Sequence, residues 1–106
     1  MIDGTLTSQS PSVLALHNMA KELNSYIVGG SIPEKANDGM MYNTSLVFDR
    51  KGNIIAKHRK VHLFDIDIKG KMTFKESEYL KPGNQITTFD TEWCKFGLAI
   101  CYDIRF

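Results

Sequence analysis

The pattern of apolar and polar positions predicts one helix followed by strands. In residues 10–26, apolar side chains recur at helical spacing, at Val13, Leu16, Ala20 and Leu23. Ser10 is expected to cap this helix, and Pro11 to occupy its first turn, where the missing N–H of proline costs nothing. The apolar run in SYIVGGS is typical of a short strand that is buried on both faces.

Further along the chain, IPEKANDG has the composition of a loop. Two strand-like runs in MYNTSLVFDRKGNIIAKHRKVHLF then flank DRKG, where Gly52 can adopt the positive φ of a tight turn, so we expect a β-hairpin. DIDIKGKMTFKESEYLKPGNQ has no sustained period and predicts a long connection, partly ordered, with one helical turn near KESEYL. ITTFDT and CKFGLAICYD predict two final strands, with a turn near Thr91 and Glu92. This order of elements indicates α/β or α+β packing.

Composition and charge limit the classes of function. The 106 residues, 42% hydrophobic and 24% charged, form one globular domain or part of one. A net charge of +1 gives no reason to expect nucleic acid or a membrane as partner. The sequence lacks a membrane-length apolar run and a signal-peptide pattern, so we expect a cytoplasmic protein. Cys94 and Cys101 form no zinc pattern with the histidines, so we expect free thiols and no metal.

The segment FGLAICYDIRF brings a thiol to the end of an apolar strand. Alternation places Gly97 and Ala99 on the same face as Cys101, which leaves room above the thiol. By analogy with the nucleophile elbow, such a position is where an α/β protein exposes a nucleophile. The alternative is that Cys101 packs as a small core residue, as free cysteines commonly do, and spacing alone favours this alternative.

A catalytic thiol also needs a nearby cation that favours the thiolate. KHRK, residues 57–60, offers several, although a solvated basic face or a weak nucleic-acid patch would explain it too. Lys60 shares its predicted face with His58, His62 and apolar residues, so it is a better candidate than Lys57. Glu76 in TFKESEYL is a candidate carboxylate, although spacing alone favours an exposed residue in a helical turn.

Two blocks, KHRKVHLFDIDIKGKMTFKESEYLKPG and FGLAICYDIRF, together resemble the nitrilase superfamily of carbon–nitrogen hydrolases, and within it the ω-amidases that act on 2-oxo acid amides. GGSIPE and YNTSLVFDRKGNIIAKHRK extend the resemblance over nearly the whole chain. It implies an α/β fold, part of a nitrilase-like four-layer α-β-β-α sandwich. Because the family domain is more than twice as long, it also implies that residues 1–106 are a partial domain that lacks the N-terminal strand and helix and the C-terminal half.

The resemblance implies a role for each candidate residue. Cys101 would be the nucleophile, Lys60 the oxyanion stabiliser and Glu76 a supporting carboxylate. The backbone N–H of Tyr102 would help to hold the oxyanion. The implied reaction converts 2-oxoglutaramate or 2-oxosuccinamate to the acid and ammonia through a thioester on the cysteine, without a cofactor.

The chain departs from the family pattern in two places. The family's general-base glutamate is missing, because Glu34 in GGSIPE matches a later part of the pattern, so we expect the chain alone to be inactive. Lys69 stands where family members commonly carry proline. The implied partners are a small-molecule amide and, for the full-length parent, a second copy in a homodimer. The alternative is a truncated, non-catalytic chain that associates through exposed sheet edges.

Overall fold

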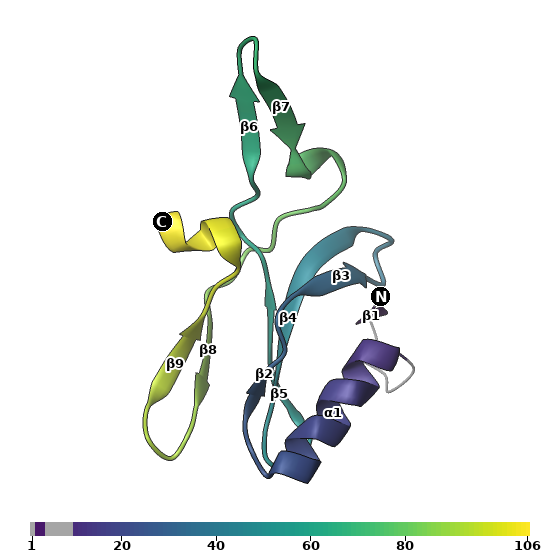
Figure 1. Ribbon diagram of the computed structural model, residues 1–106, viewed down its shortest axis with the longest axis vertical. Helices are drawn as coiled ribbons and strands as arrows, with labels where there is room; N and C mark the ends of the chain where they lie inside the picture. Colours follow the sequence, from purple (N-terminus) through teal and green to yellow (C-terminus); the bar gives the residue numbers. More distant parts are fainter. Residues whose placement is uncertain (1, 4–9) are drawn as a thin grey trace.

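The computed structural model describes residues 2–3 and 10–106, and its centre is a five-stranded sheet (Figure 1). The sheet comprises β1 (Ile2–Asp3), β2 (Ile27–Val28), β3 (Ile32–Lys35), β4 (Met41–Phe48) and β5 (Ile54–Arg59). β4 is the central strand, since it pairs antiparallel with β2, β3 and β5, while β1 pairs parallel with β3. Helix and strands in one chain confirm the α/β class.

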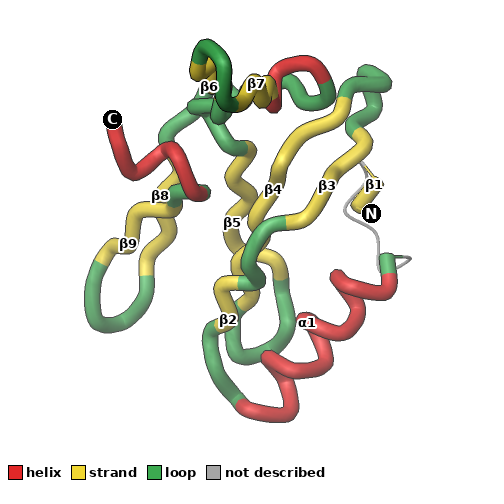
Figure 2. The backbone as a smooth tube through the Cα atoms, turned by 45° about the horizontal axis from the view of Figure 1, so that its top comes forward, coloured by secondary structure: helices red, strands yellow, loops and turns green. Residues whose placement is uncertain are grey.

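Two hairpins and two short 3₁₀ helices complete the described chain. They are β6 (Asp65–Ile68) with β7 (Met72–Lys75), β8 (Thr87–Asp90) with β9 (Lys95–Leu98), η1 (Glu76–Glu78) and η2 (Cys101–Arg105). The β8–β9 hairpin and the helix α1 (Pro11–Leu23) lie on opposite sides of β4 and β5 (Figure 2). The two sides of the sheet therefore have different surroundings.

The helix α1 forms the core with one face of the sheet. Val13 and Ala20 are buried against Leu46 and Phe48 of β4, as the helical spacing predicted. Leu23, expected on the same face, is 62% exposed, because the helix ends there and Asn24 turns the chain with a φ of 49°. Leu16, Ile27, Ile32 and Ile54 pack around this core.

The N-terminal end of α1 matches the prediction in position but not in its hydrogen bond. Ser10 is the N-cap residue, and Pro11 begins the helix. The Ser10 side chain makes no capping hydrogen bond, however, and its buried Oγ has no partner among residues 2–3 and 10–106.

Two expectations before the first hairpin were wrong. The run SYIVGGS does contain a strand, the two-residue β2, but it is not buried on both faces, since Val28 is 55% exposed. In IPEKANDG, Ile32–Lys35 is the strand β3 rather than a loop. Pairing of β3 with β4 supplies the backbone partners that loop composition does not indicate.

The β4–β5 hairpin is confirmed, with Gly52 at a φ of 82° in the turn. The long connection after it was predicted to be partly ordered, but it contains the β6–β7 hairpin. Gly70, at a φ of 77°, forms its turn, in which Lys71 N–H donates to Ile68 O at 2.9 Å. Each strand has only four residues, too few to show a clear period. The predicted helical turn near KESEYL is confirmed as η1.

The two final strands are also confirmed, as is the turn between them, where Thr91 N–H donates to Cys94 O at 3.0 Å. β9 ends at Leu98, however, and η2 begins at Cys101, so the polar end of the segment is helical. No helix in the described part of the chain is long and apolar enough to cross a membrane.

Candidate active site

Lys60 and Glu76 form a short ion pair at the end of β5. The Lys60 side chain is 2% exposed, and its Nζ donates to Glu76 Oε2 at 2.6 Å. The same carboxylate oxygen accepts the backbone N–H of Phe64 at 2.7 Å, and Glu76 N–H donates to Phe64 O at 3.2 Å. Two of the residues that the sequence selected are therefore in contact. Glu76 is not the exposed helical-turn residue that spacing alone favoured.

The environment of Glu76 keeps it ionised. Burial alone would raise the pKa of Glu76, but hydrogen bonds from Lys60 and from the Phe64 N–H hold this pKa below its ordinary value. The charge of Lys60 and a hydrogen bond from Asn43 act in the same direction. Lys60 is anchored through its backbone as well, since its N–H donates to Asn43 O at 2.8 Å. The ammonium group of Lys60 is thus held in a fixed place.

Cys101 is exposed and has an unusual backbone conformation. Its φ is 49°, in the left-handed region that residues with a Cβ rarely adopt. Such conformations cluster at functional sites, where the surrounding structure maintains them. Space above the strand is open, since a Cβ added to Gly97 would meet nothing within 4 Å. The alternative that Cys101 packs in the core is therefore wrong for this structure.

Tyr102 follows in the first turn of η2. Backbone N–H groups in the first turn of a helix have no partner within that helix, so the Tyr102 N–H is suited to bind an oxygen. The Tyr102 and Phe64 rings pack edge to face, with 5.2 Å between ring centroids. This contact links η2 to the loop whose N–H binds Glu76. Within the described residues, neither Lys60 nor Glu76 makes a direct hydrogen bond to Cys101.

Asp103 joins these segments, and the sequence analysis did not select it. Its carboxylate is 7% exposed and accepts hydrogen bonds from two sides. Oδ1 accepts the backbone N–H groups of Val61 at 3.1 Å and His62 at 2.8 Å. Oδ2 accepts Nε2–H of His58 at 2.9 Å and the backbone N–H of Ile100 at 3.0 Å. The residue before Cys101 and the residue after Lys60 thus bind to the same side chain.

These contacts keep Asp103 ionised although it is buried. Burial alone would raise the pKa of Asp103, but hydrogen bonds from His58, His62 and Ile100 hold this pKa well below its usual range. The other ring nitrogen of His58 lies 3.0 Å from Thr87 Oγ1 on β8. The sequence signals for this network were an acid two residues after the cysteine and a histidine on the predicted face of Lys60.

Glu34 belongs to a separate network. Its side chain is fully buried and accepts hydrogen bonds from Thr44 at 2.6 Å, from Lys57 at 3.0 Å and from Arg59 at 2.8 and 2.9 Å. Burial would raise the pKa of Glu34, but these partners lower it to about 2. Glu34 contacts Lys57 rather than Lys60, so its geometry agrees with the view that it is not the family's base. Lys57, likewise, is an ion-pair partner rather than a solvated charge.

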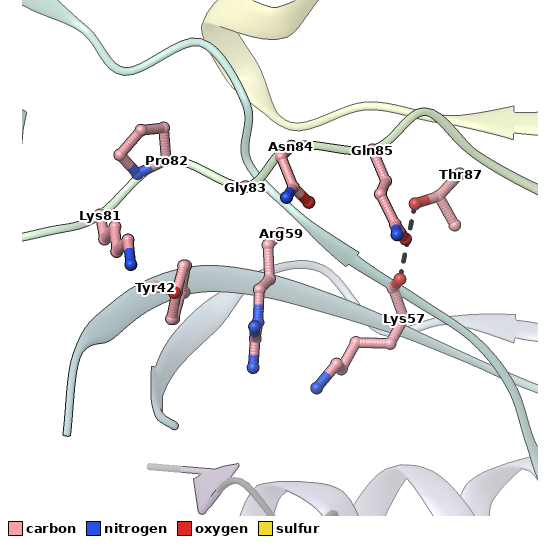
Figure 3. Close-up of a pocket in the computed structure, with 9 residues that line it drawn as sticks. All are labelled: Tyr42, Lys57, Arg59, Lys81, Pro82, Gly83, Asn84, Gln85 and Thr87. Carbon is pink, nitrogen blue, oxygen red and sulfur yellow. Dashed lines mark hydrogen bonds between the residues drawn. The ribbon is translucent and has the colours of Figure 1, made fainter. Parts of the chain in front are cut away.

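Two neighbouring pockets lie beside β5, and Asn84 and Gln85 line both. A polar pocket of about 250 Å³ is lined by Tyr42, Lys57, Arg59, Lys81, Pro82, Gly83, Asn84, Gln85 and Thr87 (Figure 3). None of the residues selected as catalytic lines this pocket or the second one. A more apolar pocket of about 350 Å³ borders His58, His62, Leu98, Ala99 and Asp103. The second pocket adjoins the segments that carry Lys60 and Cys101. In the described part of the chain, no three His, Cys, Asp or Glu side chains are arranged to hold a metal ion.

Comparisons with known proteins cover nearly the whole chain. A family model described as carbon-nitrogen hydrolase matches residues 3–106. A hydrolase of Schizosaccharomyces pombe is 57% identical over 101 residues, which are 95% of this chain and 31% of that protein. Omega-amidase NIT2 of Homo sapiens is 54% identical over 95 residues, which are 90% of this chain and 34% of that protein. The chain thus spans about a third of the length of these relatives.

Solved structures show the same similarity. The crystal structure of Nit3 from Saccharomyces cerevisiae, a member of branch 10 of the nitrilase superfamily, matches with a TM-score of 0.78 and 47% identity. It covers 92% of this chain and 32% of that one. The NitFhit protein of C. elegans matches with a TM-score of 0.76 and 32% identity, over 93% of this chain and 25% of that one. The expected fold, part of a nitrilase-like sandwich, is confirmed.

Proposed function

The chain belongs to the carbon–nitrogen hydrolase family, and from this premise we propose that its site serves an amidase of the ω-amidase type. The observation that carries the proposal is the 2.6 Å contact between Lys60 and Glu76, beside the segment that holds the exposed Cys101. A buried ammonium held by a carboxylate is a fixed positive charge, which is what a developing oxyanion requires.

The proposed reaction follows from these groups. The Cys101 thiolate attacks the amide carbon, and the carbonyl oxygen takes on negative charge. Lys60 and the N–H of Tyr102 stabilise this oxyanion, while Glu76 holds Lys60 in place. The C–N bond then breaks, the nitrogen takes the proton that the thiol lost, and ammonia leaves. Water hydrolyses the thioester that remains, which releases the acid and restores the thiol.

The proposed substrates are small 2-oxo acid amides, 2-oxoglutaramate and 2-oxosuccinamate, without a cofactor. Relatives named omega-amidase, 54–56% identical to this chain, support this choice. We propose that the chain alone turns over little substrate, because Glu34 is engaged with Lys57 and Arg59. Among the described residues, Glu76 is the carboxylate that pairs with Lys60. A cytoplasmic location and a homodimer of the full-length parent stay predictions.

An aldehyde probe tests this proposal without a need for turnover. A thiolate adds to an aldehyde to give a tetrahedral adduct whose oxygen occupies the oxyanion position. Succinic semialdehyde, labelled with ¹³C at the aldehyde carbon, is added to the Cys94→Ser protein. We expect a new tetrahedral carbon signal that Cys101→Ser abolishes. The proposal fails if the signal is absent or persists in Cys101→Ser.

The alternative of a non-catalytic chain that associates through a sheet edge has one supporting observation. Among the described strands β9 pairs only with β8, and Trp93 beside it is 68% exposed. Size-exclusion chromatography distinguishes the two, because this alternative requires a concentration-dependent oligomer. A monomer at all concentrations would exclude it.

A further inference from the structure

The strands that lead to Lys60 and to Cys101 belong to different sheets. β5 is part of the five-stranded sheet, whereas β9 pairs with β8 in a two-stranded sheet. Within the part of the chain that the structure describes, no ladder of backbone hydrogen bonds therefore fixes one of these residues relative to the other. If the two act together, as the proposed function requires, another contact must set the distance between them.

The Asp103 carboxylate makes this contact. One oxygen accepts the N–H of Val61, directly after Lys60, and the other accepts the N–H of Ile100, directly before Cys101. We propose that Asp103 is the positioning residue of the site, which sets the spacing between the Cys101 thiol and the Lys60 ammonium. This inference rests on the proposed function, and it adds a residue that does not itself touch the substrate.

The surroundings of Asp103 fit a positioning role. Its carboxylate is nearly buried, so each unsatisfied N–H around it would carry a desolvation cost. His58 on β5 donates to Oδ2 and also contacts Thr87 on β8, so it connects the carboxylate to both strands. Asp103 N–H donates to Ile100 O at 3.0 Å, which closes the turn around Cys101. The turn can then keep Cys101 in its left-handed conformation.

A change from aspartate to asparagine is a sharp test of these bonds. An asparagine side chain has one acceptor oxygen, whereas the carboxylate uses both of its oxygens as acceptors. If its NH₂ group takes the place of Oδ1, it faces the N–H groups of Val61 and His62. If it takes the place of Oδ2, it faces those of Ile100 and His58. One of the two segments must therefore separate from residue 103. Asp103→Ser, which is smaller and neutral, provides a second variant.

The experiment measures how strongly Lys60 affects Cys101. The rate of Cys101 alkylation by iodoacetamide is determined at pH 7 in a Cys94→Ser background, with and without Lys60→Met. We expect Lys60→Met to slow alkylation about tenfold, because the proposed function places the Lys60 charge beside the reacting sulfur. In Asp103→Asn or Asp103→Ser we expect the same substitution to change the rate less than about twofold.

Asp49→Asn is the matched control. Asp49 also binds backbone N–H groups, those of Lys51 and Asn53, but it lies in the β4–β5 turn. The tenfold effect of Lys60→Met should persist in Asp49→Asn. If it also persists in an Asp103 variant that circular dichroism shows to be folded, the positioning role is wrong and the proposed function stands. If Lys60→Met has no effect even with Asp103 present, both are wrong.

Discussion

The Nζ atom of Lys60 lies 2.6 Å from Oε2 of Glu76, and both side chains are largely buried. This contact connects the end of β5 to η1, 16 residues further along the chain. It holds a positive charge in the site and also stabilises the fold. The first effect is measured by adduct affinity and the second by the free energy of unfolding.

Glu76→Gln should destabilise the chain. Removing one partner of a buried ion pair leaves the other charge uncompensated, which costs about 3–5 kcal/mol. We expect the free energy of unfolding in urea to fall by about 3 kcal/mol. Glu78→Gln, at an exposed position of the same 3₁₀ helix, should change it by less than about 0.5 kcal/mol. Equal effects of the two substitutions would contradict the role of Glu76.

Stability at acid pH should depend on Glu34. Its pKa of about 2 lies below the ordinary value of 4.5, so its ionised form stabilises the folded state. This contribution is complete above the ordinary pKa and is lost as the pH falls from 4.5 towards 2. It amounts to about 3 kcal/mol. Between pH 5 and pH 2.5, we expect the free energy of unfolding in urea to fall less for Glu34→Gln than for the unmodified chain. An unchanged decrease would contradict this prediction.

Gly83 should not accept a side chain. A Cβ at this position would overlap the backbone oxygen of Arg59 and approach Arg59 Cβ to 2.8 Å. Gly83 N–H also donates to Lys60 O at 2.9 Å, so a displaced residue 83 would disturb Lys60. We expect Gly83→Ala to lower the unfolding free energy by about 1–3 kcal/mol. Gly97→Ala, with open space around it, should not lower it; if both variants are equally stable, the packing at Gly83 is not as described.

The backbone of Cys101 should be strained. A non-glycine residue at a φ of 49° costs about 1–2 kcal/mol, and glycine relieves that cost. Cys101→Gly should therefore unfold at a higher urea concentration than Cys101→Ala. At Cys94, which has no positive φ, the glycine variant should be no more stable than the alanine variant. The same order at both positions would argue against strain at Cys101.

Local sequence signals predicted the elements with a clear period or turn chemistry. The helix α1, the hairpin around Gly52 and the strands β8 and β9 follow from such signals. β3 was missed because the loop-like composition of IPEKANDG gave no sign of its pairing with the next strand, β4. The ion-pair partners of its buried Glu34, Lys57 and Arg59, lie 23 and 25 residues further along the chain. The β6–β7 hairpin was missed because its two strands are short and exposed.

Local sequence signals also predicted only part of the candidate site. Alternation placed Lys60 on one face with His58, and the structure buries both. Ile54 was expected on that face too, but a register shift between β4 and β5 pairs it with Phe48, in the core under α1. The contact with Glu76 and the network around Asp103 join segments that are 16 and 42 residues apart in the sequence. No local pattern encodes such distances. They became visible only when the fold brought the segments together.

The measurement that tests the central claim most directly is the affinity of the labelled aldehyde for three proteins, the Cys94→Ser chain and its Lys60→Met and Lys57→Met variants. Lys57 lies in β5 and Lys60 directly follows that strand, but Lys60 contacts Glu76, whereas Lys57 contacts Glu34. If Lys60 holds the oxyanion of the Cys101 adduct, Lys60→Met should weaken formation of the adduct at least about tenfold. Lys57→Met should leave it unchanged. Equal affinities in all three proteins would show that Lys60 and Cys101 do not form one site.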